Sequence, residues 1–135
     1  MPDWSIKIVP AAHPRKDAPA AFQPDLKKSK QGDPLKVQDD DIVTWNNTTP
    51  DAHWPWQTDQ NFVPFTDAQV QADPTLNLSN PIQPGKSSRP AYNVLIPNAN
   101  AKPPPATGTI YYCCKYHLHE RGTIFVTAAP SLPTS

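Results

Sequence analysis

The chain has 135 residues, with 12 basic and 12 acidic side chains and 37% hydrophobic residues. This length suits a single domain over residues 1–135 with one core, and the zero formal net charge argues against a protein that binds nucleic acid through a basic surface. The 19 prolines, against only 4 glycines, exclude long helices almost throughout. No apolar run is long enough to span a bilayer.

Alternation of apolar and polar residues predicts several short strands. They are expected at residues 4–8, 35–37, 41–47, 91–96, 107–114 and 121–128. Residues 51–88 are expected to form a long connection between strands. Within it, "FTDAQVQAD" predicts one or two helical turns, capped by Thr66 or Asp67 and ended by Pro74. Six to eight short strands predict an all-β fold, an antiparallel Greek-key sandwich or barrel with a long loop insertion.

The segment "YYCCKYHLHERG" gathers the side chains with the most distinctive chemistry. Cys113 and Cys114 are adjacent, which excludes an ordinary disulfide framework and leaves a thiolate ligand, a reactive thiol or a buried bystander. His117 follows Cys114 by three positions, so a tight loop at the end of a strand can turn both side chains toward one ion. Thiolate and imidazole together suit copper or zinc.

A third nitrogen donor is available just past an earlier strand. His53 follows the strand at residues 41–47 after a short turn, and loops of this kind can meet at one end of a sandwich. His13 is expected in a polar loop flanked by prolines, and we interpret it as a surface residue.

Three segments resemble the cupredoxin family of copper proteins. They are "DDDIVTWNNTTPDAH", "PIQPGKSS" and "TGTIYYCCKYHLHERGTIFV". The resemblance covers roughly the second two-thirds of the chain, and its last motif fixes a strand, a cysteine, a histidine and a following glycine together. It implies a cupredoxin-like Greek-key β-sandwich that holds one copper ion through two histidines, a cysteine and a weak axial donor.

The family pattern implies which residues bind the metal. The position six residues after Gly108 corresponds to the family's cysteine and is Cys114. The implied ligands are therefore His53, Cys114 and His117. The axial methionine of the short-loop family members corresponds to Glu120, the expected fourth ligand, with His119 as the alternative. This set of ligand types resembles that of the red copper protein nitrosocyanin, and a carboxylate ligand should favour Cu(II) and lower the reduction potential.

The sequence departs from the family at two positions near these ligands. Family members often have asparagine after the first histidine and serine or threonine after the cysteine, whose side chains hold the two loops together. Trp54 and Lys115 occupy these positions here, so another group must replace those hydrogen bonds or the site is more mobile. Trp54 and Trp56 are expected either to cover the metal with an apolar shell or to pack the end of the sandwich.

The resemblance implies a mononuclear copper protein that carries single electrons between partner proteins. The first alternative is a copper enzyme or sensor in which a small exogenous ligand binds an open Cu(II) position, a hypothesis that a Glu120 ligand supports. The second is a zinc or structural module, since the same donors also suit tetrahedral zinc. Because family members mostly work outside the cytoplasm, a periplasmic or otherwise exported location, with a leader already removed, is expected.

Overall fold

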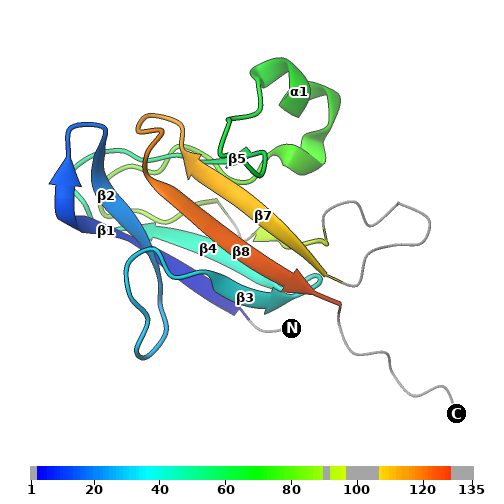
Figure 1. The fold of residues 1–135 in the computed structure, drawn as a ribbon, viewed down its shortest axis with the longest axis horizontal. Helices are drawn as coiled ribbons and strands as arrows, with labels where there is room; N and C mark the ends of the chain where they lie inside the picture. The colour runs from blue at the N-terminus through cyan, green and yellow to red at the C-terminus, as the bar shows by residue number, and fades with distance from the viewer. Residues whose placement is uncertain (1–2, 90–91, 97–106, 129–135) are drawn as a thin grey trace, which may run out of the picture.

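The computed structural model describes residues 3–89, 92–96 and 107–128, which form two packed β-sheets (Figure 1). One sheet has the strand order β2–β1–β4–β6 and the other the order β3–β8–β7–β5. The strands are β1 (Asp3–Arg15), β2 (Ala18–Pro24), β3 (Leu35–Gln38), β4 (Ile42–Asn47), β5 (Pro55–Thr58), β6 (Tyr92–Asn93), β7 (Thr107–Cys114) and β8 (Arg121–Thr127). The expected β-sandwich is confirmed.

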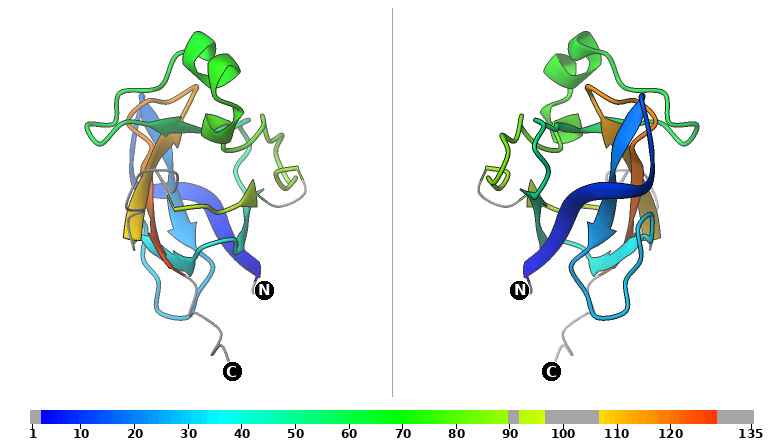
Figure 2. Two further views of the ribbon diagram at one scale, coloured as in Figure 1. Left: turned by 90° about the vertical axis from the view of Figure 1, so that its right-hand side faces the viewer. Right: turned by 90° about the vertical axis from the view of Figure 1, so that its left-hand side faces the viewer.

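Two pairs of neighbouring strands run parallel, so the expectation of an antiparallel sandwich is wrong for these two pairs. β1 pairs with β4, and β3 pairs with β8, both in parallel. The chain leaves the first sheet after β2, forms β3 in the second sheet and then returns to form β4 (Figure 2). The alternation of side chains determines which face of a strand is buried, but it does not determine the direction of the neighbouring strand.

Two strands lie where the sequence did not predict them. β2 and β5 contain or border prolines, which disguise a strand in a sequence pattern. Both are edge strands, where a missing backbone N–H is tolerated. β1 also continues through His13, which is exposed as expected but belongs to a strand and not to a loop. Of the strand expected at 91–96, only β6 forms, and residues 91 and 97 lie outside the described residues.

The long connection at residues 51–88 returns to pack against β4 before the chain reaches β6. It contains β5, a short helix α1 (Asp67–Ala72) and the 3₁₀ turn η1 (Pro74–Leu76). Thr66 caps α1 as predicted, and Gln69 completes a capping box. The returning chain forms an isolated bridge to His53 through Ile82. No helix among the described residues is long and apolar enough to cross a bilayer.

The inward face of β7 reaches the core as the alternation predicted. Ile110, Tyr112 and Cys114 are all buried. The Tyr112 ring packs edge-on against Phe22 and Trp45, with centroid distances of 4.8 and 5.5 Å, a favoured geometry for aromatic pairs. These aromatic contacts therefore pack the core around Tyr112, two residues before Cys114 on the same face of β7.

The ring of Tyr112 fits against β8 only because its partner there is glycine. Gly122 pairs with Tyr112 across the two strands, and a Cβ atom at position 122 would overlap the phenol ring. We expect Gly122→Ala to lower the free energy of unfolding by about 2 kcal/mol or more, as overpacked cores do, measured by urea denaturation. Adding Tyr112→Leu should recover part of this loss relative to the sum of the single substitutions. An unfolding free energy unchanged by Gly122→Ala would contradict this packing.

Candidate metal centre

The loop after β4 is fixed so that the side chain of His53 points inward. The amide of Asn47 donates hydrogen bonds to the carbonyl oxygens of Asp51 and Ile82, at 2.7 and 3.0 Å. His53 and Ile82 also exchange two backbone hydrogen bonds, at 3.1 and 2.7 Å. The imidazole is completely buried, and its Nε2 atom has no hydrogen-bond partner among the described residues. Nδ1 is the nitrogen that faces the cluster, 3.0 Å from Glu120 Oε1.

The turn between β7 and β8 brings three further side chains together. The N–H of His117 donates to the carbonyl oxygen of Cys114 at 3.1 Å, and the N–H of Glu120 donates to that of His117 at 2.9 Å. The N–H of Cys114 donates in turn to the carbonyl oxygen of Glu120 at 2.9 Å. This closed set of three bonds places every third side chain of the turn on one side.

Four side chains from the two loops converge on one point. The Cys114 Sγ atom lies 3.6 Å from His53 Nδ1 and 3.7 Å from His117 Nδ1. Glu120 Oε1 lies 3.0 Å from His53 Nδ1 and 3.3 Å from His117 Nδ1. All four donor atoms lie within 4.8 Å of one another. The structure thus brings together the four residues that the sequence singled out.

Of these four, His117 is the one that reaches solvent. Its side chain is 22% exposed, whereas His53, Cys114 and Glu120 are buried. One thiolate, two imidazoles and one carboxylate fit a copper or zinc ion, both of which accept sulfur, nitrogen and oxygen donors. The same arrangement excludes most of the solvent from three of the four donors.

His119, the alternative fourth ligand, lies apart from the cluster. Its Nδ1 atom is 2.7 Å from Asp17 Oδ2, in the turn between β1 and β2, and both side chains are about half exposed. Glu120 therefore occupies the position next to the two imidazoles, and the adjacent His119 points away. This divergence is expected for neighbouring residues in a turn.

Backbone N–H groups of Trp54 and Lys115 join the two loops. The N–H of Trp54 lies 3.4 Å from Cys114 Sγ, and the N–H of Lys115 donates to the carbonyl oxygen of Trp54 at 2.8 Å. The Lys115 ammonium lies over the rings of Trp54 and Trp56, 4.5 and 4.0 Å from their centroids, and pairs with Asp67 at 2.9 Å. At positions 54 and 115 the loops are thus connected by hydrogen bonds from main-chain N–H groups and by a cation–π contact.

The two tryptophans both pack the end of the sandwich beside the cluster. Their rings meet edge-on at 5.2 Å. Trp56 is buried in β5 opposite Cys113 and donates from Nε1 to the carbonyl oxygen of Phe65 at 2.7 Å. Trp54 is half-buried and donates to the carbonyl oxygen of Ser79 at 3.2 Å. They form an apolar wall beside the loop that carries the Cys114 donor.

Cys113 and Cys114 occupy different environments. Cys114 belongs to the core cluster, whereas Cys113 is buried outside it, on the other face of β7. Burial, together with the negative charge of Cys114, raises the pKa of the Cys113 thiol to about 11. Cys113 is therefore a protonated, packed side chain at neutral pH.

The electrostatics of the metal-free cluster hold a proton on His53. Burial lowers the pKa of this imidazole, but hydrogen bonds to Cys114 and Glu120 and their negative charges outweigh burial and raise the pKa to about 9. A bound metal cation would offset the same negative charges.

This raised pKa predicts a pH dependence of the metal-free protein. Because the folded state binds the His53 proton more tightly than the unfolded state, the stabilisation is full below pH 6.5 and disappears as pH rises through about 9. We expect the free energy of unfolding to fall by up to about 3 kcal/mol between pH 6.5 and 9.5, measured by urea denaturation with a chelator present. The His53→Gln variant should lack this part of the pH dependence, and equal pH slopes in the two proteins would contradict it.

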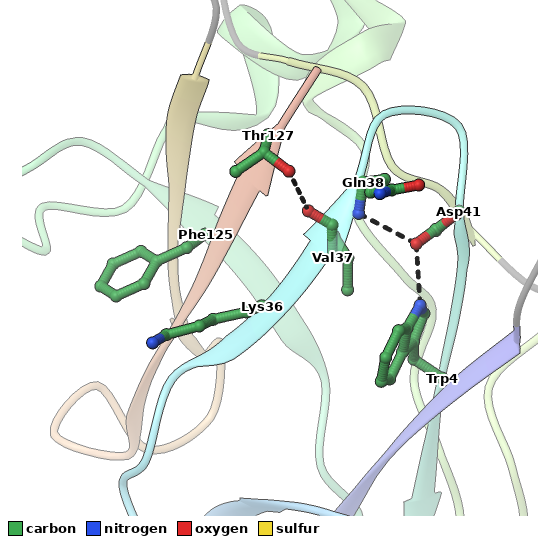
Figure 3. Close-up of a pocket in the computed structure, with 7 residues that line it drawn as sticks. All are labelled: Trp4, Lys36, Val37, Gln38, Asp41, Phe125 and Thr127. Carbon is green, nitrogen blue, oxygen red and sulfur yellow. Dashed lines mark hydrogen bonds between the residues drawn. The ribbon is translucent and has the colours of Figure 1, made fainter. Parts of the chain in front are cut away.

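A pocket lies outside this cluster. It has a volume of about 540 Å³ and is lined by Trp4, Lys36, Val37, Gln38, Asp41, Phe125 and Thr127 (Figure 3). Its residues on β8 lie at the end of that strand opposite Glu120. Asp41 Oδ2 accepts hydrogen bonds there from Trp4 Nε1 and the Gln38 N–H, both at 2.9 Å. None of the four converging residues lines this pocket.

Comparison with known proteins finds similar structures but no similar sequence. No protein-family model and no curated protein matches the sequence. The structure is similar to that of a purple cupredoxin from Nitrosopumilus maritimus, with a TM-score of 0.54 and 17% identity over 93% of this chain and 98% of that chain. It is also similar to a variant of the McoA multicopper oxidase from Aquifex aeolicus, with a TM-score of 0.52 and 11% identity over 93% of this chain but only 26% of the oxidase.

Proposed function

We propose that this chain, which has the cupredoxin fold, is a mononuclear copper protein that acts in one-electron transfer. The proposal rests on one observation above all, the convergence of one sulfur, two imidazole nitrogens and one carboxylate oxygen within 4.8 Å. His53, Cys114, His117 and Glu120 would hold one copper ion. When bound, copper would supply the Cu(II)/Cu(I) couple.

The donor set favours copper over zinc on chemical grounds. Soft thiolate and borderline imidazole donors suit copper, and divalent copper exceeds zinc in affinity for a given set of nitrogen, oxygen and sulfur ligands. The zinc hypothesis has a simple test: a protein that retains zinc and gains no visible absorption with Cu(II) would support it.

The rigidity of the site favours electron transfer. Electron transfer is fastest when the ligands move little as the charge of the ion changes. Two backbone hydrogen bonds hold His53 to Ile82, and the hydrogen-bonded turn holds Cys114, His117 and Glu120. The partly exposed edge of His117 offers the shortest route to a protein partner, so we propose that a redox partner docks over it. We further propose an exported location.

A reaction with a small exogenous ligand is the second candidate function. The hard carboxylate donor of Glu120 supports it, because a Cu(II) ion with an oxygen ligand accepts further small ligands more readily. Against it, only His117 among the four donors reaches solvent.

One titration separates the two functions. Azide or nitric oxide is added to the Cu(II)-loaded protein while the visible and electron-paramagnetic-resonance spectra are recorded, and reduction by a small-molecule donor is timed by stopped flow. An electron carrier should keep its spectra with either ligand and be fully reduced in one fast phase. A new absorption band that saturates with azide would instead support the second function.

A further inference from the structure

The two carboxylate oxygens of Glu120 have different partners. Oε1 faces the imidazoles of His53 and His117. Oε2 accepts a hydrogen bond from the backbone N–H of Ala20, with a nitrogen-to-oxygen distance of 2.7 Å and both groups buried. We propose that the Ala20 amide is a positioning group that makes Glu120 a one-oxygen ligand, an inference that rests on the proposed metal site.

The geometry of β2 explains why this amide is free to donate. β2 is the edge strand of its sheet and pairs only with β1. Successive N–H groups of a strand alternate between its two edges, so the amides of Ala20 and Phe22 share one edge and those of Ala21 and Gln23 the other. Since Ala20 donates to Glu120 on the other sheet, its edge is the one that faces away from β1. The N–H groups of an edge strand otherwise lack partners.

The hydrogen bond from the Ala20 N–H to Glu120 Oε2 is strong enough to position the carboxylate. A hydrogen bond from an uncharged N–H to a buried carboxylate is charge-assisted and stronger than one between neutral groups. Displacing Glu120 would also leave the buried Ala20 N–H without a partner, at a further cost. The carboxylate therefore resists the rotation that would bring Oε2 to the ion beside Oε1.

The consequence is that residues 3–24, the β1–β2 hairpin, belong to the metal site although they contribute no ligand. A carboxylate fixed through Oε2 would offer a bound ion one donor oxygen in either oxidation state. An unchanged number of oxygen donors would favour fast electron exchange. It would also limit the preference for Cu(II), which a carboxylate that binds through both oxygens would increase.

The contact itself is testable in the metal-free protein, independently of copper. Hydrogen exchange of the Ala20 amide is measured by NMR in the parent protein and in Glu120→Leu. We expect exchange at Ala20 to become at least about tenfold faster in the variant, as loss of a hydrogen bond to a charged acceptor predicts. The amides of Ala21 and Gln23, which face β1, should keep their rates. An Ala20 rate unchanged relative to those controls would overturn the inference.

Replacing the amide itself tests the positioning role. Incorporation of lactic acid at position 20 exchanges the N–H for an ester oxygen and leaves the side chain unchanged. We expect a shifted electron-paramagnetic-resonance spectrum and a shifted reduction potential in the copper-loaded ester, because Glu120 is then released. The same exchange at position 21 weakens the β1–β2 pairing and should lower stability without shifting either signal.

The outcomes distinguish this inference from the proposed function. If the position-20 ester has the parent's spectrum and potential, the positioning role is wrong although copper binds. If the parent protein itself fails to bind copper, the proposed function is wrong, and the inference about a metal ligand is overturned with it.

Discussion

Replacing Cys114 by serine is expected to abolish the visible absorption of the Cu(II)-loaded protein. The colour of such a site arises from charge transfer between the thiolate and Cu(II), and a serine hydroxyl is a hard, protonated donor that cannot replace it. Cys114 Sγ is one of the four converging donor atoms, 3.6 and 3.7 Å from the two imidazole nitrogens. The measurement is an absorption spectrum at matched copper content, and the loss should be complete.

The neighbouring cysteine supplies the matched control. Cys113→Ser changes an equally buried sulfur one residue away, on the other face of β7. It should cost some stability, because it places a hydroxyl in an apolar position, but it should keep the colour. Colour that survives in Cys114→Ser, or that disappears in a folded Cys113→Ser protein, would show that the ligand is wrongly assigned.

Replacing Glu120 by methionine is expected to raise the reduction potential and to move the spectrum toward ordinary blue copper. The carboxylate brings negative charge and a hard oxygen to the ion, and both favour Cu(II) over Cu(I), whereas a thioether is neutral and soft. We expect a rise of more than about 60 mV, which corresponds to a tenfold change in the equilibrium of a one-electron couple. Voltammetry measures this directly.

His119 offers the control for this second prediction. It neighbours Glu120 but pairs with Asp17 outside the cluster, so His119→Met should leave the potential and the spectrum nearly unchanged. A larger shift from His119→Met than from Glu120→Met would reverse the assignment of the fourth ligand.

The strands next to the site were predictable because alternating side chains distinguish their buried face from their other face. In β7 the alternation of Ile110, Tyr112 and Cys114 identified the inward face, and all three are buried in the core. The short spacing between Cys114 and His117 and the following Gly122 then placed the turn. The position of His53 near the end of the sandwich was predictable because it follows β4 after a short turn.

The parts that were not predictable depend on contacts between distant segments. The alternation within β1 and β3 gives no information on whether β4 and β8 run parallel to them. β2 is composed mainly of alanine and proline, so it lacks the β-branched residues that mark a strand. A proline-bounded apolar segment is nevertheless typical of an edge strand, and this signal could have indicated β2.

The sequence did not predict the hydrogen bonds around the cluster. The N–H of Ala20 and the N–H of Trp54 act through the main chain, so no residue type marks them. The stacking of Lys115 on Trp54 and Trp56 follows from the pairing of β5 with β7, which the sequence did not reveal. The residue changes at 54 and 115 only indicated that some other group had to join the loops.

Anomalous diffraction from crystals of the Cu(II)-loaded protein, recorded on both sides of the copper absorption edge, would locate the proposed metal ion. We expect one copper peak per chain, within bonding distance of His53 Nδ1, Cys114 Sγ, His117 Nδ1 and Glu120 Oε1, with Glu120 Oε2 still bonded to the Ala20 N–H. A peak elsewhere, or none near the Cys114 sulfur, would contradict the proposed metal site.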